Sequence, residues 1–341
     1  MRKRIGNRTL YFPSRPSVNG FYSVVGEKES QGPLKDWFDL SIGEGHFGED
    51  SWEKAESKLI ESASLGAIEQ AGLKNEQIQC FFGGDLMNQC ISTNYALRTL
   101  QIPFLGLYGA CSTMAESLLM GSVCVDGGFC DHALCATSSH FCSAERQFRF
   151  PLEYGGQRPP TAQWTVTGSG ACVLSLQGDG PYITYATPGK VVDAGITDLN
   201  NMGAAMAPAA CDTLLAFFED TGTSPSNYDM ILTGDLGNVG KKLLHGLLRD
   251  NGIEAIDNLE DCGCLIFDDE AQDTHAGGSG CGCSASVLNS YIFKKMRNKE
   301  LKKILFLATG ALMSPTSSLQ GETIPAIAHL LQIEAERSQP Q

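Results

Sequence analysis

The residue best placed to do chemistry is Cys111, which follows a short apolar run, 104–109, and precedes an apolar stretch from Met114 to about Val125. This order predicts a strand, a tight turn and a buried helix, with Cys111 at the N-terminus of the helix. Unpaired backbone N–H groups and the helix dipole at such a position stabilise a thiolate and bind anions. Cys111 is therefore a candidate nucleophile or anion contact, and the alternative is one buried cysteine among thirteen.

Internal matches in the sequence predict how this turn is positioned. Asp235 lies 150 positions after Asp85 within a similar segment, and two further matches share a single offset of 172. The matched segments are 81–86 with 231–236, 111–112 with 283–284, and 136–138 with 308–310. They indicate a duplicated chain, although similar strand–helix patterns arising independently are the alternative.

Each copy also opens with a predicted helix that ends at a glycine. The first helix is expected from about Trp52 to Ala71 with Asp50 as N-cap and Gly72 as the stop, and the second over about 204–221. Short apolar runs without alternation predict buried, mainly parallel strands covered by helices. We therefore expect an α/β protein with an N-terminal half over 1–177 and a C-terminal half over 178–341.

Duplication should bring the corresponding turns together at the middle of the molecule. The expected ligand contacts there are Cys111, His140, Asp235, Gly278, Ser279, Cys281 and Thr309. The expected anion contacts come from the only basic cluster of the first half, Arg146, Arg149 and Arg158. A lone histidine is more often structural, and the arginines could equally form a solvated face or a dimer edge with ion pairs.

Composition excludes several classes of function. The formal net charge of −14 argues against nucleic acid and against direct binding to anionic lipid. No apolar stretch is long enough to span a membrane, and no apolar segment follows the basic start, so we expect a soluble, non-secreted protein with reduced cysteines. The Cys-Gly-Cys sequences at 262–264 and 281–283 lack the usual spacing of zinc sites, so neither a metal nor another cofactor is expected.

Longer motifs carry a resemblance to a known family. Residues 109–113, Gly-Ala-Cys-Ser-Thr, resemble the nucleophile turn of thiolases and ketoacyl synthases. The wider pattern is similar to the stage V sporulation protein AD family of the thiolase-like superfamily. The segments that carry it are 136–140, 144–149, 153–158, 167–171, 195–198, 206–210 and 276–281.

This resemblance implies a fold, a ligand and a location. The fold is a five-layer α-β-α-β-α sandwich built from two duplicated halves. The expected function is to bind dipicolinic acid (pyridine-2,6-dicarboxylate), free or as its calcium chelate, during endospore formation and germination. The protein is expected in the forespore, peripheral at the spore inner membrane, beside the SpoVA membrane-channel proteins, and as a homodimer.

The sequence also departs from the catalytic pattern of its enzyme relatives. Asp235 stands where ketoacyl synthases carry a histidine, and Ser279 or Cys281 stands where a second histidine or asparagine is expected. The last loop, 308–313, lacks the second cysteine of thiolases. An aspartate beside Cys111 would raise the pKa of the thiol, so we expect no enzyme activity. The alternatives are a Cys111-dependent acyl transferase with altered chemistry and an adaptor whose cleft is vestigial.

Overall fold

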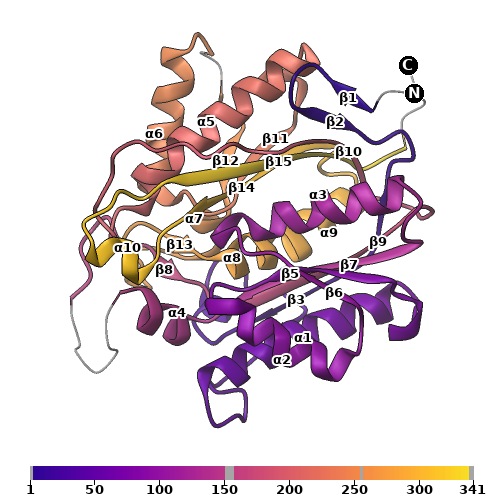
Figure 1. Ribbon diagram of the computed structural model, residues 1–341, viewed down its shortest axis with the longest axis horizontal. Helices are drawn as coiled ribbons and strands as arrows, with labels where there is room; N and C mark the ends of the chain where they lie inside the picture. The colour runs from indigo at the N-terminus through magenta and orange to yellow at the C-terminus, as the bar shows by residue number, and fades with distance from the viewer. Residues whose placement is uncertain (1–2, 150–156, 254–255, 338–341) are drawn as a thin grey trace.

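The computed structural model describes residues 3–149, 157–253 and 256–337, and it has five layers (Figure 1). One outer layer is α5 (Met202–Thr221) with α6 (Gly237–Asp250), and the other is α1 (Trp52–Gln70) with α2 (Ile91–Leu100). The central layer contains α3 (Thr113–Asp126), α8 (Cys281–Val287) and α9 (Phe293–Arg297). Strands fill the two layers between them, so the α/β fold class and the five-layer sandwich are confirmed.

The strand order has matching halves. It runs β12-β11-β14-β15-β10-β3-β9-β7-β5-β6. From either end, three parallel strands are followed by two antiparallel ones, and the two groups meet only through the pairing of Tyr182 with Ser17. The bounds are β3 Ser17–Val25, β5 Cys80–Gly84, β6 Phe104–Gly106, β7 His132–Ser139, β9 Gly168–Ser175, β10 Tyr182–Thr187, β11 Met230–Thr233, β12 Leu259–Asp261, β14 Lys303–Ala311 and β15 Ala326–Glu334. The expected boundary at residue 177 lies between β9 and β10 and stays a prediction.

Shorter elements complete the fold around the ends of these strands. They are β1 Arg4–Ile5, β2 Thr9–Tyr11, β4 Leu40–Ser41, β8 Trp164–Thr165, β13 Gly278–Ser279, α4 Phe141–Phe148, α7 Cys262–Ile266 and α10 Pro315–Leu319. The strands β8 and β13 form a separate parallel pair, Trp164 with Gly278 and Thr165 with Ser279. This pair places Ser279 at one end of the central layer.

The core lies on both faces of the central helices. The helix predicted from Met114 to Val125 is confirmed as α3, which packs on β7 of one strand layer and on β14 of the other. Met114 and Leu118 are fully buried because strands cover the helix on two sides, whereas Met120, Val123 and Cys124 are partly buried. Burial of this helix fixes its N-terminus, and with it Cys111, in the middle of the molecule.

Both outer helices follow the expected pattern except at one cap. Gly72 and Gly222 adopt positive φ angles of +69° and +65° at the ends of α1 and α5, as the sequence predicts. The prediction of Asp50 as N-cap is wrong, because the Ser51 side chain accepts the hydrogen bond from the Lys54 N–H. Asp50 is exposed and forms an ion pair with Lys54 instead.

Candidate functional site

The site begins at the turn between β6 and α3, where Ala110–Ser112 form a short 3-10 helix. Ala110 has a φ of +52°, a left-handed conformation that costs a non-glycine residue about 1–2 kcal/mol. Hydrogen bonds within the turn hold it, because Ser112 Oγ donates to the Gly109 carbonyl at 2.7 Å and Thr113 Oγ1 donates to the Ala110 carbonyl at 2.6 Å. The sharp turn brings Cys111 to the start of α3 with 5% of its surface exposed.

The end of β14 lies directly against this turn. A Cβ atom added to Gly310 would come within 2.3 Å of the Gly109 carbonyl oxygen, so only glycine fits there. The close approach of two backbones places the neighbouring Thr309 beside the Cys111 turn.

Asp235, which follows β11, completes the centre of the site. It is fully buried, and its carboxylate accepts hydrogen bonds from Thr309 Oγ1 at 3.0 Å, the Gly280 N–H at 3.0 Å and Ser279 Oγ at 3.2 Å. Burial raises the pKa of Asp235 to about 6, against the opposing effect of the hydrogen bonds from the Gly280 N–H and the Thr309 hydroxyl. The carboxylate is thus shared by segments from both halves of the chain.

The electrostatics of Cys111 are set by burial and by Asp235. Burial raises the pKa of the Cys111 thiol well above its usual value, and the negative charge of Asp235 raises it further. The hydrogen bonds from Gly280 and Ser279 act in the opposite direction but do not compensate. The thiol is therefore neutral at physiological pH, in spite of its place at a helix N-terminus.

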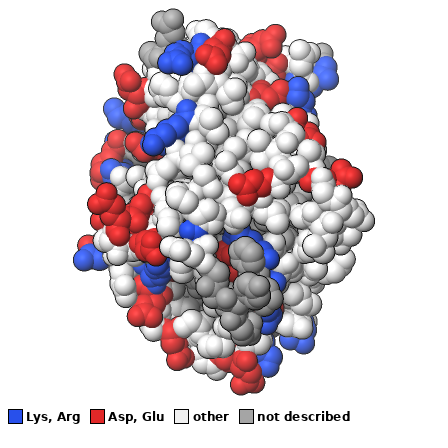
Figure 2. All heavy atoms as spheres, turned by 90° about the vertical axis from the view of Figure 1, so that its left-hand side faces the viewer, with Lys and Arg blue, Asp and Glu red and all other residues white. Residues whose placement is uncertain are grey.

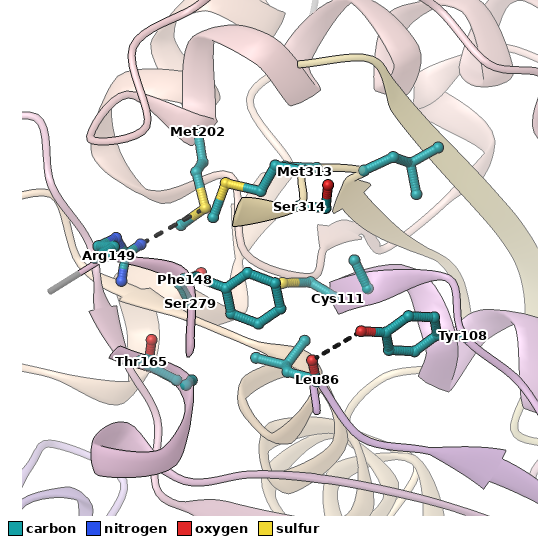
Figure 3. Close-up of a pocket in the computed structure, with 14 residues that line it drawn as sticks. Leu86, Tyr108, Cys111, Phe148, Arg149, Thr165, Met202, Ser279, Met313 and Ser314 are labelled. Atoms are coloured by element: carbon teal, nitrogen blue, oxygen red, sulfur yellow. Dashed lines mark hydrogen bonds between the residues drawn. The ribbon is translucent and has the colours of Figure 1, made fainter. Parts of the chain in front are cut away.

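A cavity of about 240 Å³ opens above this centre (Figure 3). Its lining is mainly apolar, with Phe148 and Leu86 facing the Cys111 sulfur in the close-up. The lining residues are Leu86, Tyr108, Ala110, Cys111, Ala144, Phe148, Arg149, Thr165, Met202, Ser279, Ala311, Leu312, Met313 and Ser314. Figure 2 shows the face of the molecule on this side, where charged side chains gather mostly along the edges.

The predicted contacts around the turn do come together. Cys111 and Ser279 line the cavity, and Asp235 and Thr309 lie directly behind them. Gly278 belongs to the same β13 turn, where its carbonyl accepts a hydrogen bond from Gln163 at 2.9 Å.

Two other predicted contacts do not reach the cavity. Cys281 is fully buried, and its thiol donates to the Ser138 carbonyl at 2.9 Å. His140 caps α4, because its Nδ1 accepts from the Cys142 N–H at 3.1 Å while Nε2 bonds with the Gly45 carbonyl at 2.7 Å. The structure thus gives His140 a structural role.

Comparisons with known proteins fit this geometry. A model of the stage V sporulation protein AD family matches residues 6–334. The chain belongs to this family. Stage V sporulation protein AD of Bacillus subtilis (strain 168) is 48% identical to it over 327 residues, which cover 96% of each chain.

Two solved structures illustrate which folds this chain resembles. 3-Oxoacyl-[acyl-carrier-protein] synthase III from Aquifex aeolicus VF5 aligns with a TM-score of 0.56 and 10% identity, over 94% of this chain and 99% of that one. Cerulenin-bound OleA of Xanthomonas campestris aligns with a TM-score of 0.57 and 13% identity, over 94% and 96%. At such identities the likeness shows a thiolase-like fold and nothing about activity.

The three arginines expected as anion contacts in this stage V sporulation protein AD relative have separate environments. Arg149 lines the cavity. Arg146 is half-exposed, pairs with Glu53 and lies over the Trp52 ring, outside the cavity. Arg158 lies 4.9 Å from the centroid of the Trp164 ring. Its guanidinium donates to the carbonyl groups of Ala162, Asp273 and Thr274.

Several cavity residues of this family member were not predicted. Phe148 ends α4, Met202 begins α5 and Met313 lies in the loop after β14, and none of the three was singled out as a ligand contact. Leu86 and Met313 do share one signal, because each follows the carboxyl end of a strand in a matched segment. Ligand sites in α/β proteins form at such strand ends.

The described ranges contain no group of three or more His, Cys, Asp or Glu residues that could hold a metal ion. In the same part of the chain, no helix is both long and apolar enough to cross a membrane.

Proposed function

We propose that this chain is a non-catalytic binding protein for dipicolinic acid, free or as its calcium chelate. It supports movement of the ligand into the developing spore and its release at germination. It acts in the forespore, peripheral at the spore inner membrane, beside the SpoVA membrane-channel proteins. The observation that carries the proposal is a small cavity above a neutral thiol that lies beside a buried carboxylate.

The paired groups argue against nucleophilic catalysis. A nucleophilic cysteine needs a base that takes its proton or a positive environment that lowers its pKa. The pKa of Asp235 is about 6, whereas burial and the charge of Asp235 raise the pKa of the Cys111 thiol well above its usual value, so Asp235 is too weak a base to take the proton of this thiol. Among the described residues that line the cavity there is also no histidine to take that proton.

The size and chemistry of the cavity favour a compact ring with polar or charged substituents. Sites for drug-sized molecules measure roughly 300–1,000 Å³, so a cavity of about 240 Å³ suits a single-ring compound better than a long acyl chain. Phe148 and Leu86 offer apolar contacts to a ring. Arg149 offers hydrogen-bond donors to its substituents, and Ser279 Oγ, whose proton goes to Asp235, offers an acceptor.

Calorimetric titration of the purified protein with dipicolinate, with and without equimolar calcium, tests this proposal. Saturable binding with one ligand per chain is expected in at least one condition. If folded protein binds neither free dipicolinate nor its calcium chelate, the proposed ligand is excluded. That result would support the hypothesis of an adaptor protein whose cleft is vestigial.

A second candidate is a Cys111-dependent acyl transferase. The position of Cys111 at the start of α3, on the cavity wall of a fold shared with condensing enzymes, favours it. Incubation with acetyl-CoA and longer acyl-CoA thioesters, followed by intact mass measurement, distinguishes the two functions. We expect no acyl adduct and no release of CoA.

The proposed oligomer is a homodimer. Light scattering at micromolar concentration should give about twice the chain mass, and a monomer mass would overturn this part of the proposal.

A further inference from the structure

Arg149 has an incomplete set of hydrogen-bond partners inside the cavity. Its side chain is 6% exposed, and Nη1 forms an ion pair with Glu145, one turn earlier on α4. Nη2 has the sulfur of Met202 as its neighbour at 3.6 Å, and Nε has no hydrogen-bond partner among the residues that the structure describes. Figure 3 shows Arg149 at the cavity wall with the Met202 sulfur in front of it.

Such an arrangement is unfavourable unless another molecule completes it. A buried donor without a partner costs about 1–3 kcal/mol, and a thioether is only a weak acceptor. Nε and Nη2 form the side edge of the guanidinium, and a carboxylate can accept both of their hydrogen bonds in parallel. Glu145 forms an ion pair with Nη1, and Thr165 Oγ1 donates to the same Glu145 oxygen at 3.3 Å. These contacts hold the guanidinium in place and leave the donors of its Nε/Nη2 edge available to a ligand.

We propose that the Nε/Nη2 edge of Arg149 is a carboxylate subsite, at which one carboxylate of the ligand replaces the sulfur of Met202. The inference rests on the proposed function, since it assigns one end of the dipicolinate to a particular side chain. Met202 is suited to this exchange, because methionine is unbranched and changes rotamer readily. Glu145 acts as a positioning residue, which orients the guanidinium without binding the ligand.

This assignment also fixes the direction of the ligand in the cavity. Asp235 is a poor neighbour for a second negative group when it is ionised, so one of the two carboxylates of the ligand belongs at Arg149, away from Asp235. The ring then lies along Phe148 and Leu86, and its far side faces Cys111 and Ser279.

Titration of four proteins with free dipicolinate tests the subsite. Arg149→Gln should weaken binding on the order of 10- to 100-fold, because it removes a charged, two-bond contact. Arg149→Lys should give an intermediate loss, since lysine keeps the charge but not the fork. Arg146→Gln is the matched control, because Arg146 lies on the same helix but outside the cavity, and its affinity should stay within about twofold of wild type.

Glu145→Gln separates an electrostatic role from general damage to α4. Loss of this negative charge beside Arg149 should tighten dipicolinate binding several-fold. If Glu145 and Arg149 only stabilised α4, both Glu145→Gln and Arg149→Gln would weaken binding. Circular dichroism and thermal unfolding should establish that each variant is folded before titration.

The outcomes distinguish this inference from the proposed function. If wild-type protein binds dipicolinate and folded Arg149→Gln binds it equally well, the subsite is overturned while the function stands. If the wild-type protein binds no dipicolinate at all, both are overturned. Pyridine-2-carboxylate provides a further comparison, because it should keep the Arg149 dependence with a single carboxylate.

Discussion

The thiol of Cys111 lies next to the carboxylate of Asp235, a residue from the other half of the chain, and the negative charge of Asp235 raises the pKa of the thiol beyond the effect of burial. This relationship keeps the thiol protonated, because ionisation would place two negative charges side by side in a buried site. The turn before α3 resembles a nucleophile turn, but its cysteine is a protonated thiol and not a reactive thiolate.

We expect Cys111 to react slowly with alkylating agents. Each unit by which its pKa exceeds that of a free thiol reduces the thiolate fraction about tenfold. Iodoacetamide at pH 7.5, followed by peptide mass mapping, should therefore modify Cys111 at least about tenfold more slowly than free N-acetylcysteine. Asp235→Asn should increase the rate, since it removes the neighbouring charge. A rate far above that of the free thiol would support the hypothesis of a Cys111-dependent acyl transferase.

Asp235 should make the protein less stable as pH rises. Its pKa is about 6 in the folded protein and about 3.8 when unfolded, so between these values the folded state retains the proton more strongly. The free energy of unfolding should then fall by about 2 kcal/mol from pH 4 to pH 6, out of a total of about 3 kcal/mol between roughly pH 3 and pH 7, and level off above. Urea unfolding across this range should show a smaller decrease for Asp235→Asn.

Glu29 has to be considered in the same experiment. Burial raises its pKa to about 7, so it contributes a pH dependence in the same direction in both proteins. The quantity to compare is therefore the difference between wild type and Asp235→Asn. An identical pH dependence in the two proteins would show that Asp235 is not perturbed as described.

Much of the fold follows from local sequence patterns, but the choice between adjacent caps does not. Apolar residues from Met114 to Val125 can only form a buried helix, and Gly72 and Gly222 supply the left-handed stops. Asp50 and Ser51 are both good capping residues, and the path of the preceding chain decides between them.

The centre of the site was predictable and its walls were not. Matched segments at constant offsets bring Cys111 and Asp235 to the same place, because duplicated turns meet at the middle of the fold. The apolar wall is formed by Phe148 and Met202 from distant segments that share no motif. Sequence also could not separate Arg149 from Arg146, since only the non-helical backbone of Arg149, with φ −124° and ψ −76°, sets it apart at the end of α4.

The Asp235→Asn variant should also reveal the charge state of the ligand. If the calcium chelate binds with its metal near this carboxylate, loss of the charge should weaken binding of the chelate. If the free dianion binds, the same change should tighten binding, because a repulsive neighbour is removed. Titrations with and without calcium distinguish the two cases, and equal affinities in all four measurements would place the ligand away from Asp235.

Substitution of Cys111 by a bulky residue should close the cavity. We expect Cys111→Trp to abolish binding of dipicolinate in either charge state, because the indole would fill space next to Phe148 and Ser279. Cys111→Ala is the control and should retain binding. Unchanged affinity in a folded Cys111→Trp protein would place the ligand elsewhere and favour an adaptor role.

His140 should matter for stability and not for the ligand. His140→Ala removes the cap of α4 and the bond to Gly45, so the free energy of unfolding should fall by about 1–3 kcal/mol. His140→Asn, which can still cap the helix, should recover part of the loss. Dipicolinate affinity should be unchanged in both proteins, and a selective loss of affinity would restore His140 as a ligand contact.

The close approach of Gly310 to the Gly109 carbonyl fixes the backbone of the turn that carries Cys111, and the side chains of the cavity wall are not part of this contact. Any side chain at Gly310 would push apart two backbone segments and displace Cys111, whereas changes at Met202 or Phe148 alter only the space above. The binding preference of this cavity could therefore be redesigned at its wall, with a new ligand as the goal, while the turn that carries the thiol keeps its shape.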